Sequence, residues 1–172
     1  YEGANPISNV WAAKAIEMCS QNIVRAITDP SDEEARGAML LAASFAGIGF
    51  GNSGVTLPHG MSYPVAGMVS DYYPEGYPQD HPMVPHGMAV ILNAPAVFRF
   101  TSQTNPRNHL YAATLMGADT TGASLKDAGA ILAEAIIDIM QKTGMPNGLK
   151  AVGYGMQDIK NLVEGTLPQH RV

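Results

Sequence analysis

The segment LKDAGAILAEAIIDIMQK, residues 125–142, decides the predicted fold class because it holds the most regular helical pattern in the chain. Its apolar residues recur at every third or fourth position, which places them on one face of an α-helix. Gly144 and Pro146 follow at once, and this pair is typical of a helix C-terminus. The segment therefore predicts a helix with one buried face. That face consists of Ala128, Ile131, Leu132, Ala135, Ile136, Ile139 and Met140.

Comparable patterns lie on both sides of this helix. Asn5-Pro6 and Asn105-Pro106 each place an N-cap residue before a proline at the first helical position, so each predicts a helix start. No hairpin dipeptide lies between alternating apolar runs, so we expect no extensive β-sheet. We therefore predict an all-α domain of six or seven helices. The further helices are expected over 6–27, from 31 into the stretch 47–54, and over 57–68, 86–101, 106–116 and 158–167.

The second of these helices is expected to be capped by a side chain and buried. Ser31 and Glu34 have the spacing of a capping box, in which each side chain bonds the backbone N–H of the other residue. The run from Met39 to Ala46 is apolar nearly all round, which is typical of a helix inside a core. The glycine-rich stretch 47–54 follows, and its four glycines permit positive φ, so we expect the helix to end there.

Composition and charge narrow the function classes. The chain has 172 residues, enough for one domain whose core needs no disulfide or structural metal. Its net charge of −5 argues against nucleic-acid and anionic-membrane partners, which attract clustered Lys and Arg. Only 15% of the residues are charged, below the usual share of about a quarter. We therefore expect part of the surface to face a partner, such as a further domain or a second copy in a homo-oligomer.

The chain begins with Tyr1 and shows neither a signal-peptide pattern nor an apolar run of the roughly 18–20 residues that a membrane span needs. We expect residues 1–172 to form one helical domain that is a piece of a longer protein. The expected compartment is the cytoplasm, with the mitochondrial matrix as the alternative. The single cysteine, Cys19, lies on an apolar helix face, excludes an internal disulfide and is interpreted as a packed thiol.

One tetrapeptide occurs twice and carries the candidate chemistry. Pro58-His59-Gly60-Met61 returns as Pro85-His86-Gly87-Met88. Proline stiffens the approach to each histidine, and glycine leaves space beside it, so both imidazoles could be directed into one cavity. Neutral imidazole is a good ligand for Fe²⁺ and Zn²⁺. The alternative interpretation, two helix-start histidines bonded to solvent or carbonyl groups, is about equally well supported by the residues alone.

The residues alone leave the ligand set incomplete, because such metals need three or more protein ligands. Nearby candidates are Asp71, Glu75, Asp80 and His81, all in a predicted loop and at no known ligand spacing. His81 is either a proton relay or a solvated loop residue. Tyr63 shares a helix face with His59 and either donates a hydrogen bond to a substrate oxygen or lies at an interface. His109 and His170 are expected at the surface.

Three motifs together resemble the iron-containing (group III) alcohol dehydrogenase family, and within it the hydroxyacid-oxoacid transhydrogenase branch. They are GIGFGNSG at 47–54, HGMSYP at 59–64 and DHPMVPHG at 80–87, and the closing GTLPQ at 165–169 is also similar to that branch. The resemblance covers essentially the whole chain. It implies a multi-helix fold like the C-terminal domain of dehydroquinate synthase-like enzymes and iron-containing alcohol dehydrogenases.

The resemblance also implies a site. One divalent metal, Fe²⁺ or Zn²⁺, is held by an Asp and a His on one helix and by two further histidines, to which His59 and His86 correspond. The first two ligands and the NAD(P)-binding domain are expected before Tyr1, so this chain alone is expected to be inactive. Implied substrates are alcohols, or a hydroxyacid and an oxoacid between which bound nicotinamide carries hydride.

One position departs from the wider family. Many members have a second histidine four residues after the ligand that corresponds to His59, and Tyr63 occupies that position here. A phenol, with an ordinary pKa of about 10, does not act as a base at neutral pH as imidazole does. We interpret Tyr63 and His81 as candidate catalytic residues, and His59 and His86 as candidate metal ligands. The alternatives are a metal-dependent hydrolase or lyase, and a non-enzymatic helical interaction module.

Overall fold

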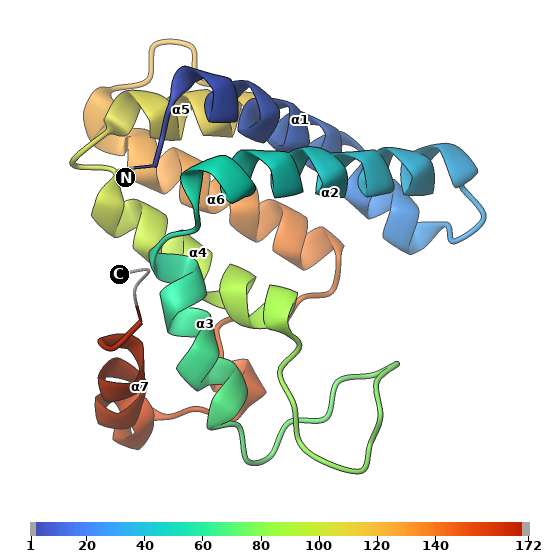
Figure 1. The fold of residues 1–172 in the computed structure, drawn as a ribbon, viewed down its shortest axis with the longest axis vertical. Helices are drawn as coiled ribbons and strands as arrows, with labels where there is room; N and C mark the ends of the chain where they lie inside the picture. Colours follow the sequence, from blue (N-terminus) through green and yellow to red (C-terminus); the bar gives the residue numbers. More distant parts are fainter. Residues whose placement is uncertain (1–2, 170–172) are drawn as a thin grey trace. The chain divides into compact units, whose positions relative to one another are not determined.

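The computed structural model describes residues 3–169 and confirms the all-α prediction, since it contains no strand within that range. Figure 1 shows the helices in chain order. The α-helices are α1 (Pro6–Thr28), α2 (Glu33–Ser53), α3 (Leu57–Gly67), α4 (His86–Thr101), α5 (Pro106–Leu115), α6 (Ala128–Lys142) and α7 (Ile159–Thr166). Three short 3-10 helices are also present, namely η1 (Leu125–Asp127), η2 (Leu149–Val152) and η3 (Met156–Asp158).

The chain forms two compact units, and each is discontinuous in sequence. The first comprises residues 1–54 and 98–144, and the second comprises 55–97 and 145–172. Helix α4 contributes to both, because its residues up to Val97 belong to the second unit and the rest to the first. Both repeated histidine motifs therefore lie in the second unit.

The first unit is built from helices that approach one another closely. Helices α1 and α2 lie side by side, and α5 packs on α6 and α1 (Figure 1). Gly49 makes the α1–α2 contact possible, because a Cβ atom at this position would lie 3.3 Å from the backbone nitrogen of Ala12. Trp11 and Phe45 also contact each other across this pair, with ring centroids 5.3 Å apart. Small residues at the contacts thus set the short spacing of the helices.

The second unit holds α3 between α7 and the loop that leads to α4. Gly165 of α7 faces α3, where an added Cβ atom would lie only 2.8 Å from Cβ of Pro64. Tyr154, between η2 and η3, is buried and donates a hydrogen bond of 2.7 Å to the carbonyl oxygen of Val65. The loop 68–85 is closed by a bond of 2.8 Å from the Met83 N–H to the Tyr72 carbonyl. These contacts fix α3, which carries the first histidine motif.

The predicted N-cap of α2 is wrong, and its predicted end is confirmed. The N-cap is Asp32 rather than Ser31, and its carboxylate accepts the N–H of Ala35 at 2.9 Å. Ser31 instead bonds the carboxylate of Asp29 in the preceding turn. The helix ends in the glycine-rich stretch, as predicted: its last residue is Ser53, and Gly54 takes a positive φ of 79°. Gly49 packs against α1, which favours its helical conformation despite the weak intrinsic preference of glycine.

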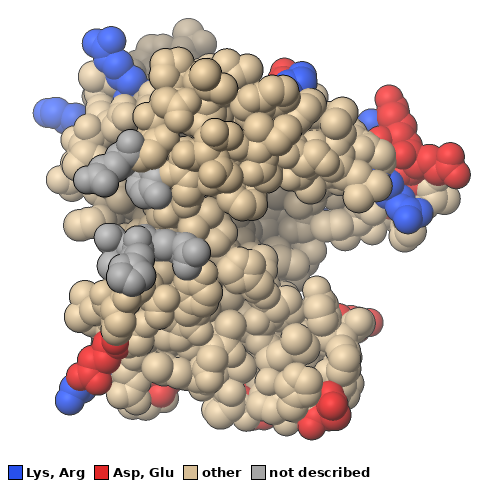
Figure 2. Space-filling model, in the orientation of Figure 1, with Lys and Arg blue, Asp and Glu red and all other residues tan. Residues whose placement is uncertain are grey.

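The prediction that α2 is buried is also wrong for the described chain. Only Ala35, Ala42 and Gly49 of this helix are buried, while Leu40 is 74% exposed. Residues 37–53 contain no charged residue, and in Figure 2 the charged side chains gather at the margins of the visible face, one group of them at the right, where α1 and α2 are joined. An apolar patch of this kind is unusual on the free surface of a monomer.

Within residues 3–169, no single helix is long and apolar enough to cross a bilayer. Only α2 and α3 taken together, with the bend between them, reach that length and apolar composition.

Candidate metal centre

Both repeated histidines lie in the first turn of a helix. Helix α3 begins at Leu57 after the extended residue Thr56, and Pro58 occupies the first turn, where its missing N–H costs no helical hydrogen bond. His59 is therefore the third residue of α3. His86 is the first residue of α4, directly after Pro85. The same tetrapeptide thus serves two slightly different helix starts, and each directs an imidazole from a helix N-terminus.

The structure brings these two imidazoles together. The ring centroids of His59 and His86 are 5.4 Å apart, with a tilt of 56° between the ring planes. A metal–nitrogen bond of about 2.0–2.1 Å places a ring centroid about 3.2 Å from the ion, so two rings at a tetrahedral angle are separated by about 5.2 Å. The observed separation fits two ligands of one ion. His59 is half-buried and His86 is exposed, so the pair is accessible from outside this unit.

Tyr63 lies beside this pair, as its helical spacing from His59 predicts. Its ring centroid is 6.3 Å from that of His86, with a tilt of 40°. The side chain is 38% exposed. One turn of α3 therefore presents an imidazole and a phenol on one face, and α4 adds the second imidazole. A phenol in this position can donate a hydrogen bond to a molecule bound at the pair.

The backbone around His59 is held from inside the unit. Ser62 is fully buried, and its hydroxyl donates a hydrogen bond of 2.7 Å to the His59 carbonyl. At the other end of α3, the buried Tyr154 bonds the Val65 carbonyl, which the helix end leaves without an intrahelical partner. Burial, and secondarily the charge of Asp158, raises the pKa of the Tyr154 phenol. Tyr154 was missed by the sequence analysis, because nothing in the sequence links it to a carbonyl 89 residues away.

The acidic loop does not complete the ligand set. His81 is exposed, and its Nδ1 lies 2.9 Å from a carboxylate oxygen of Asp80. Within residues 3–169, no group of three or more His, Cys, Asp or Glu side chains could hold a metal ion. Asp71, Glu75 and Asp80 therefore do not join His59 and His86 as a ligand cluster. Among the described residues, His59 and His86 therefore form a pair without a third ligand side chain.

The remaining histidines and the cysteine have other settings. His109 bonds the Asn105 carbonyl through Nδ1 at 2.8 Å and the Thr101 hydroxyl through Nε2 at 3.0 Å, so both ring nitrogens are engaged within the first unit. His170, predicted to be at the surface, lies outside the described residues. Cys19 is half-buried on α1, and this burial raises the pKa of its thiol, as expected of a packed cysteine.

Comparison with known proteins identifies the protein family. Residues 2–172 match the Fe-containing alcohol dehydrogenase family, C-terminal. This chain therefore belongs to the iron-containing alcohol dehydrogenase family, whose members are oxidoreductases, and corresponds to its C-terminal helical domain. The family favours the oxidoreductase interpretation over the hydrolase or lyase and over the non-enzymatic module.

Particular relatives narrow the class further. The chain is 54% identical over 173 residues to the probable hydroxyacid-oxoacid transhydrogenase, mitochondrial, of Dictyostelium discoideum, covering 100% of this chain and 32% of that protein. The fold matches 1,3-propanediol oxidoreductase with a TM-score of 0.86 and 28% identity, over 98% of this chain and 41% of the other. A sulfoacetaldehyde reductase from Bifidobacterium kashiwanohense, solved with NAD⁺, matches with a TM-score of 0.76 and 26% identity, over 98% and 39%. The chain spans about a third of the length of the curated relatives it matches.

Proposed function

We propose that this chain is the metal-binding part of an NAD(P)-linked oxidoreductase and acts together with a nucleotide-binding domain outside residues 1–172. The observation that carries the proposal is the pair His59 and His86, whose ring centroids are 5.4 Å apart although the residues come from two helices. Family membership supports the reaction class. The relatives are about three times as long as this chain, and the part that it does not match is long enough for a second domain. Without that domain, residues 1–172 are inactive.

The proposed ligands from this chain are His59 and His86, which would hold a divalent metal, Fe²⁺ or Zn²⁺, with an Asp and a His from elsewhere in the protein. A metal held there supplies Lewis-acid chemistry, which favours the alkoxide form of an alcohol, and the nicotinamide accepts the hydride. Two imidazoles alone leave the coordination incomplete, so affinity of residues 1–172 for such ions is weak.

Tyr63 is proposed to orient the substrate. Its ring lies beside His86 and is partly exposed, so the phenol can donate a hydrogen bond to a substrate oxygen. His81 is proposed as a proton relay, because its imidazole is exposed to water and lies beside the Asp80 carboxylate. The proposed substrates are a hydroxyacid and an oxoacid, since the transhydrogenase is the relative with 54% identity. That relative is named as mitochondrial, which supports the mitochondrial matrix over the cytoplasm for this protein. We also propose that the protein forms a homo-oligomer.

The test measures metal content rather than activity alone. The full-length natural protein is purified as wild type and as His59→Ala, His86→Ala and His109→Ala variants, and bound iron and zinc are quantified by mass spectrometry. Each of the first two changes is expected to lower metal content at least tenfold, whereas His109→Ala retains it. Full metal occupancy in either ligand variant, with the fold intact by circular dichroism, would overturn the proposal.

A further inference from the structure

Asn147 is the one asparagine of this chain that precedes a glycine. It lies in the segment between α6 and η2, and Gly148 is the N-cap of η2. The Asn147 side chain is exposed, and within residues 3–169 its amide makes no hydrogen bond to another residue. An exposed amide that no neighbour holds is free to rotate toward the peptide bond that follows it.

The reaction open to such a residue is attack by the Gly148 nitrogen on Cγ, the side-chain carbonyl carbon of Asn147. A bond forms between these two atoms, the bond from Cγ to Nδ2 breaks, and ammonia leaves with the proton of the attacking N–H. The product is a five-membered cyclic imide. Water then opens the imide at either of its two carbonyl carbons, which gives aspartate or isoaspartate. The reacting groups belong to adjacent residues, so the attack is intramolecular.

The local backbone permits this attack. Gly148 donates its N–H to the Pro146 carbonyl at 3.1 Å, which closes a three-residue γ-turn centred on Asn147. A single bond of this kind opens readily in an exposed segment between helices. Gly148 has a φ of 77°, and nothing lies within 4 Å of the position that a Cβ atom would take. The attacking nitrogen is therefore approached without steric hindrance from its own residue.

The other eight asparagines of the chain have settings that oppose the reaction. Asn5 and Asn105 precede prolines, whose nitrogen carries no proton to lose. The remaining six lie in α-helices, where the fixed ψ angle holds the following nitrogen in place, and each precedes a residue with a side chain. These six are Asn9, Asn22, Asn52, Asn93, Asn108 and Asn161. They serve as internal controls for Asn147.

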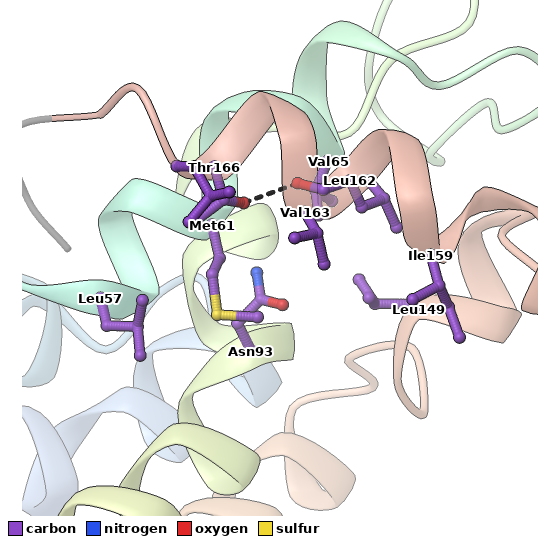
Figure 3. A pocket seen from close by; sticks show the side chains of 10 residues that line it. Leu57, Met61, Val65, Asn93, Leu149, Ile159, Leu162, Val163 and Thr166 are labelled. Atoms are coloured by element: carbon purple, nitrogen blue, oxygen red, sulfur yellow. Dashed lines mark hydrogen bonds between the residues drawn. The ribbon is translucent and has the colours of Figure 1, made fainter.

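The segment that follows Gly148 is tied into the second unit. Leu149, the first residue of η2, lines the apolar cavity between α3 and α7 (Figure 3). Val152 of η2 is 1% exposed, and Tyr154 bonds the Val65 carbonyl of α3. In isoaspartate the main chain runs through Cβ and Cγ, so the connection before η2 becomes one atom longer. Aspartate adds a negative charge but leaves the main chain unchanged.

We propose that Asn147 deamidates spontaneously in the folded protein, and that the isoaspartate product destabilises the second unit. The exposed amide, the adjacent glycine and the open space around it support the first part. The buried attachments of η2 support the second part, because a longer connection displaces Leu149 and Val152 from their contacts. The reaction consumes only water, and it is independent of the function proposed for His59 and His86.

The test uses the full-length natural protein, incubated in its folded state at pH 8. Peptide mapping by mass spectrometry locates each asparagine that becomes an acid, and an isoaspartate-specific methyltransferase with a labelled methyl donor quantifies isoaspartate. We expect conversion at Asn147 at least tenfold faster than at any other asparagine of residues 1–172. Asn147→Gln is the matched control. It keeps an exposed amide, but attack has to close a larger ring, so isoaspartate should be lost from this peptide.

A second measurement separates the added main-chain atom from the added charge. The isoaspartate form is isolated chromatographically and compared with Asn147→Asp, which has the same charge and an unaltered main chain. The isoaspartate form should unfold at a lower guanidinium concentration, whereas Asn147→Asp should match wild type. An amide at Asn147 that persists in the folded protein and reacts only in denaturant would overturn the proposed site. Equal unfolding midpoints for the isoaspartate form and Asn147→Asp would overturn the proposed effect on the second unit.

Discussion

The hydroxyl of Tyr154 donates a hydrogen bond of 2.7 Å to the carbonyl oxygen of Val65, across 89 residues of sequence. The bond ties the segment between η2 and η3 to the C-terminal turn of α3, and it satisfies a carbonyl that the end of the helix leaves unpaired. The C-terminal turn of the helix that carries His59 is therefore held by a side chain from a distant segment of the same unit. This contact leads to the first prediction.

Tyr154→Phe should lower the free energy of unfolding by about 1–2 kcal/mol, because the Val65 carbonyl loses its donor in a buried setting. The pH dependence should change as well. The folded-state pKa of Tyr154 is raised by burial, so its stabilising effect is complete below the ordinary pKa of about 10 and is lost as the pH rises through the higher folded value. Urea titrations at pH 7 and above pH 10 measure both effects. An equally steep alkaline loss in the Phe variant would contradict the assignment.

Gly165→Ala should destabilise the second unit. The new Cβ atom would lie 2.8 Å from Cβ of Pro64 and 3.0 Å from Cε of Met68, and the proline ring cannot move aside. Overpacking of this kind usually costs about 1–3 kcal/mol, more than the roughly 1 kcal/mol that alanine gains over glycine in a helix. Gly37→Ala is the control, because nothing lies within 4 Å of its Cβ position in α2. It should stabilise the protein by about 0.5–1 kcal/mol, as measured by thermal unfolding.

Asp32→Ala should weaken α2 by about 1 kcal/mol, because the N–H of Ala35 loses its side-chain acceptor. Ser31→Ala should change stability by less than about 0.5 kcal/mol, since Ser31 contacts only the exposed carboxylate of Asp29. Guanidinium titrations of the two variants distinguish the two residues as N-caps. A larger effect at Ser31 than at Asp32 would restore the capping box that the sequence predicts.

Tyr63→Phe in the full-length protein should reduce kcat/KM about tenfold while metal content stays unchanged, because the ring contact with His86 is kept and only the hydroxyl is lost. Tyr63→His should add a group that titrates near pH 6.5, so the pH–rate profile should gain a limb in that range. Steady-state kinetics between pH 5 and 9, with metal analysis of each sample, measure both results. Loss of metal in Tyr63→Phe would show that Tyr63 holds the ligands instead of orienting substrate.

Local signals in the sequence predicted much of the fold. The Asn-Pro pairs located the starts of α1 and α5 at the residues observed, and His86 begins α4 as predicted. These signals depend on neighbours within one turn, which is why the sequence alone contains them. The repeated tetrapeptide pointed to two imidazoles that lie close together, but their distance depends on how α3 and α4 pack. No sequence pattern measures that distance.

Other features depend on packing between distant segments, which the sequence does not show. Gly49 of α2 fits against the backbone at Ala12, a contact 37 residues away in sequence. Asn93 looked like an ordinary residue of an apolar helix, and only the fold shows its amide among the side chains that line a cavity. Local preference located the end of α2 only to within the stretch 47–54 and gave no signal at Asn93, since tertiary contacts outweigh the intrinsic preference of single residues.

The discontinuity of the second unit has a consequence for the nascent chain on the ribosome. Helix α7, which packs on α3 through Gly165, is synthesised about ninety residues after α3 has ended. At a translation rate of about 5–20 residues per second, α3 lacks its partner α7 for roughly 5–20 s. The whole of α5 and α6 is translated in that time. During that interval the first unit can complete itself and the histidine-bearing unit cannot. A chain that terminates shortly before Ile159 therefore still contains the residues of the first unit but lacks α7 of the second. The incomplete second unit is then a substrate for chaperones and proteases.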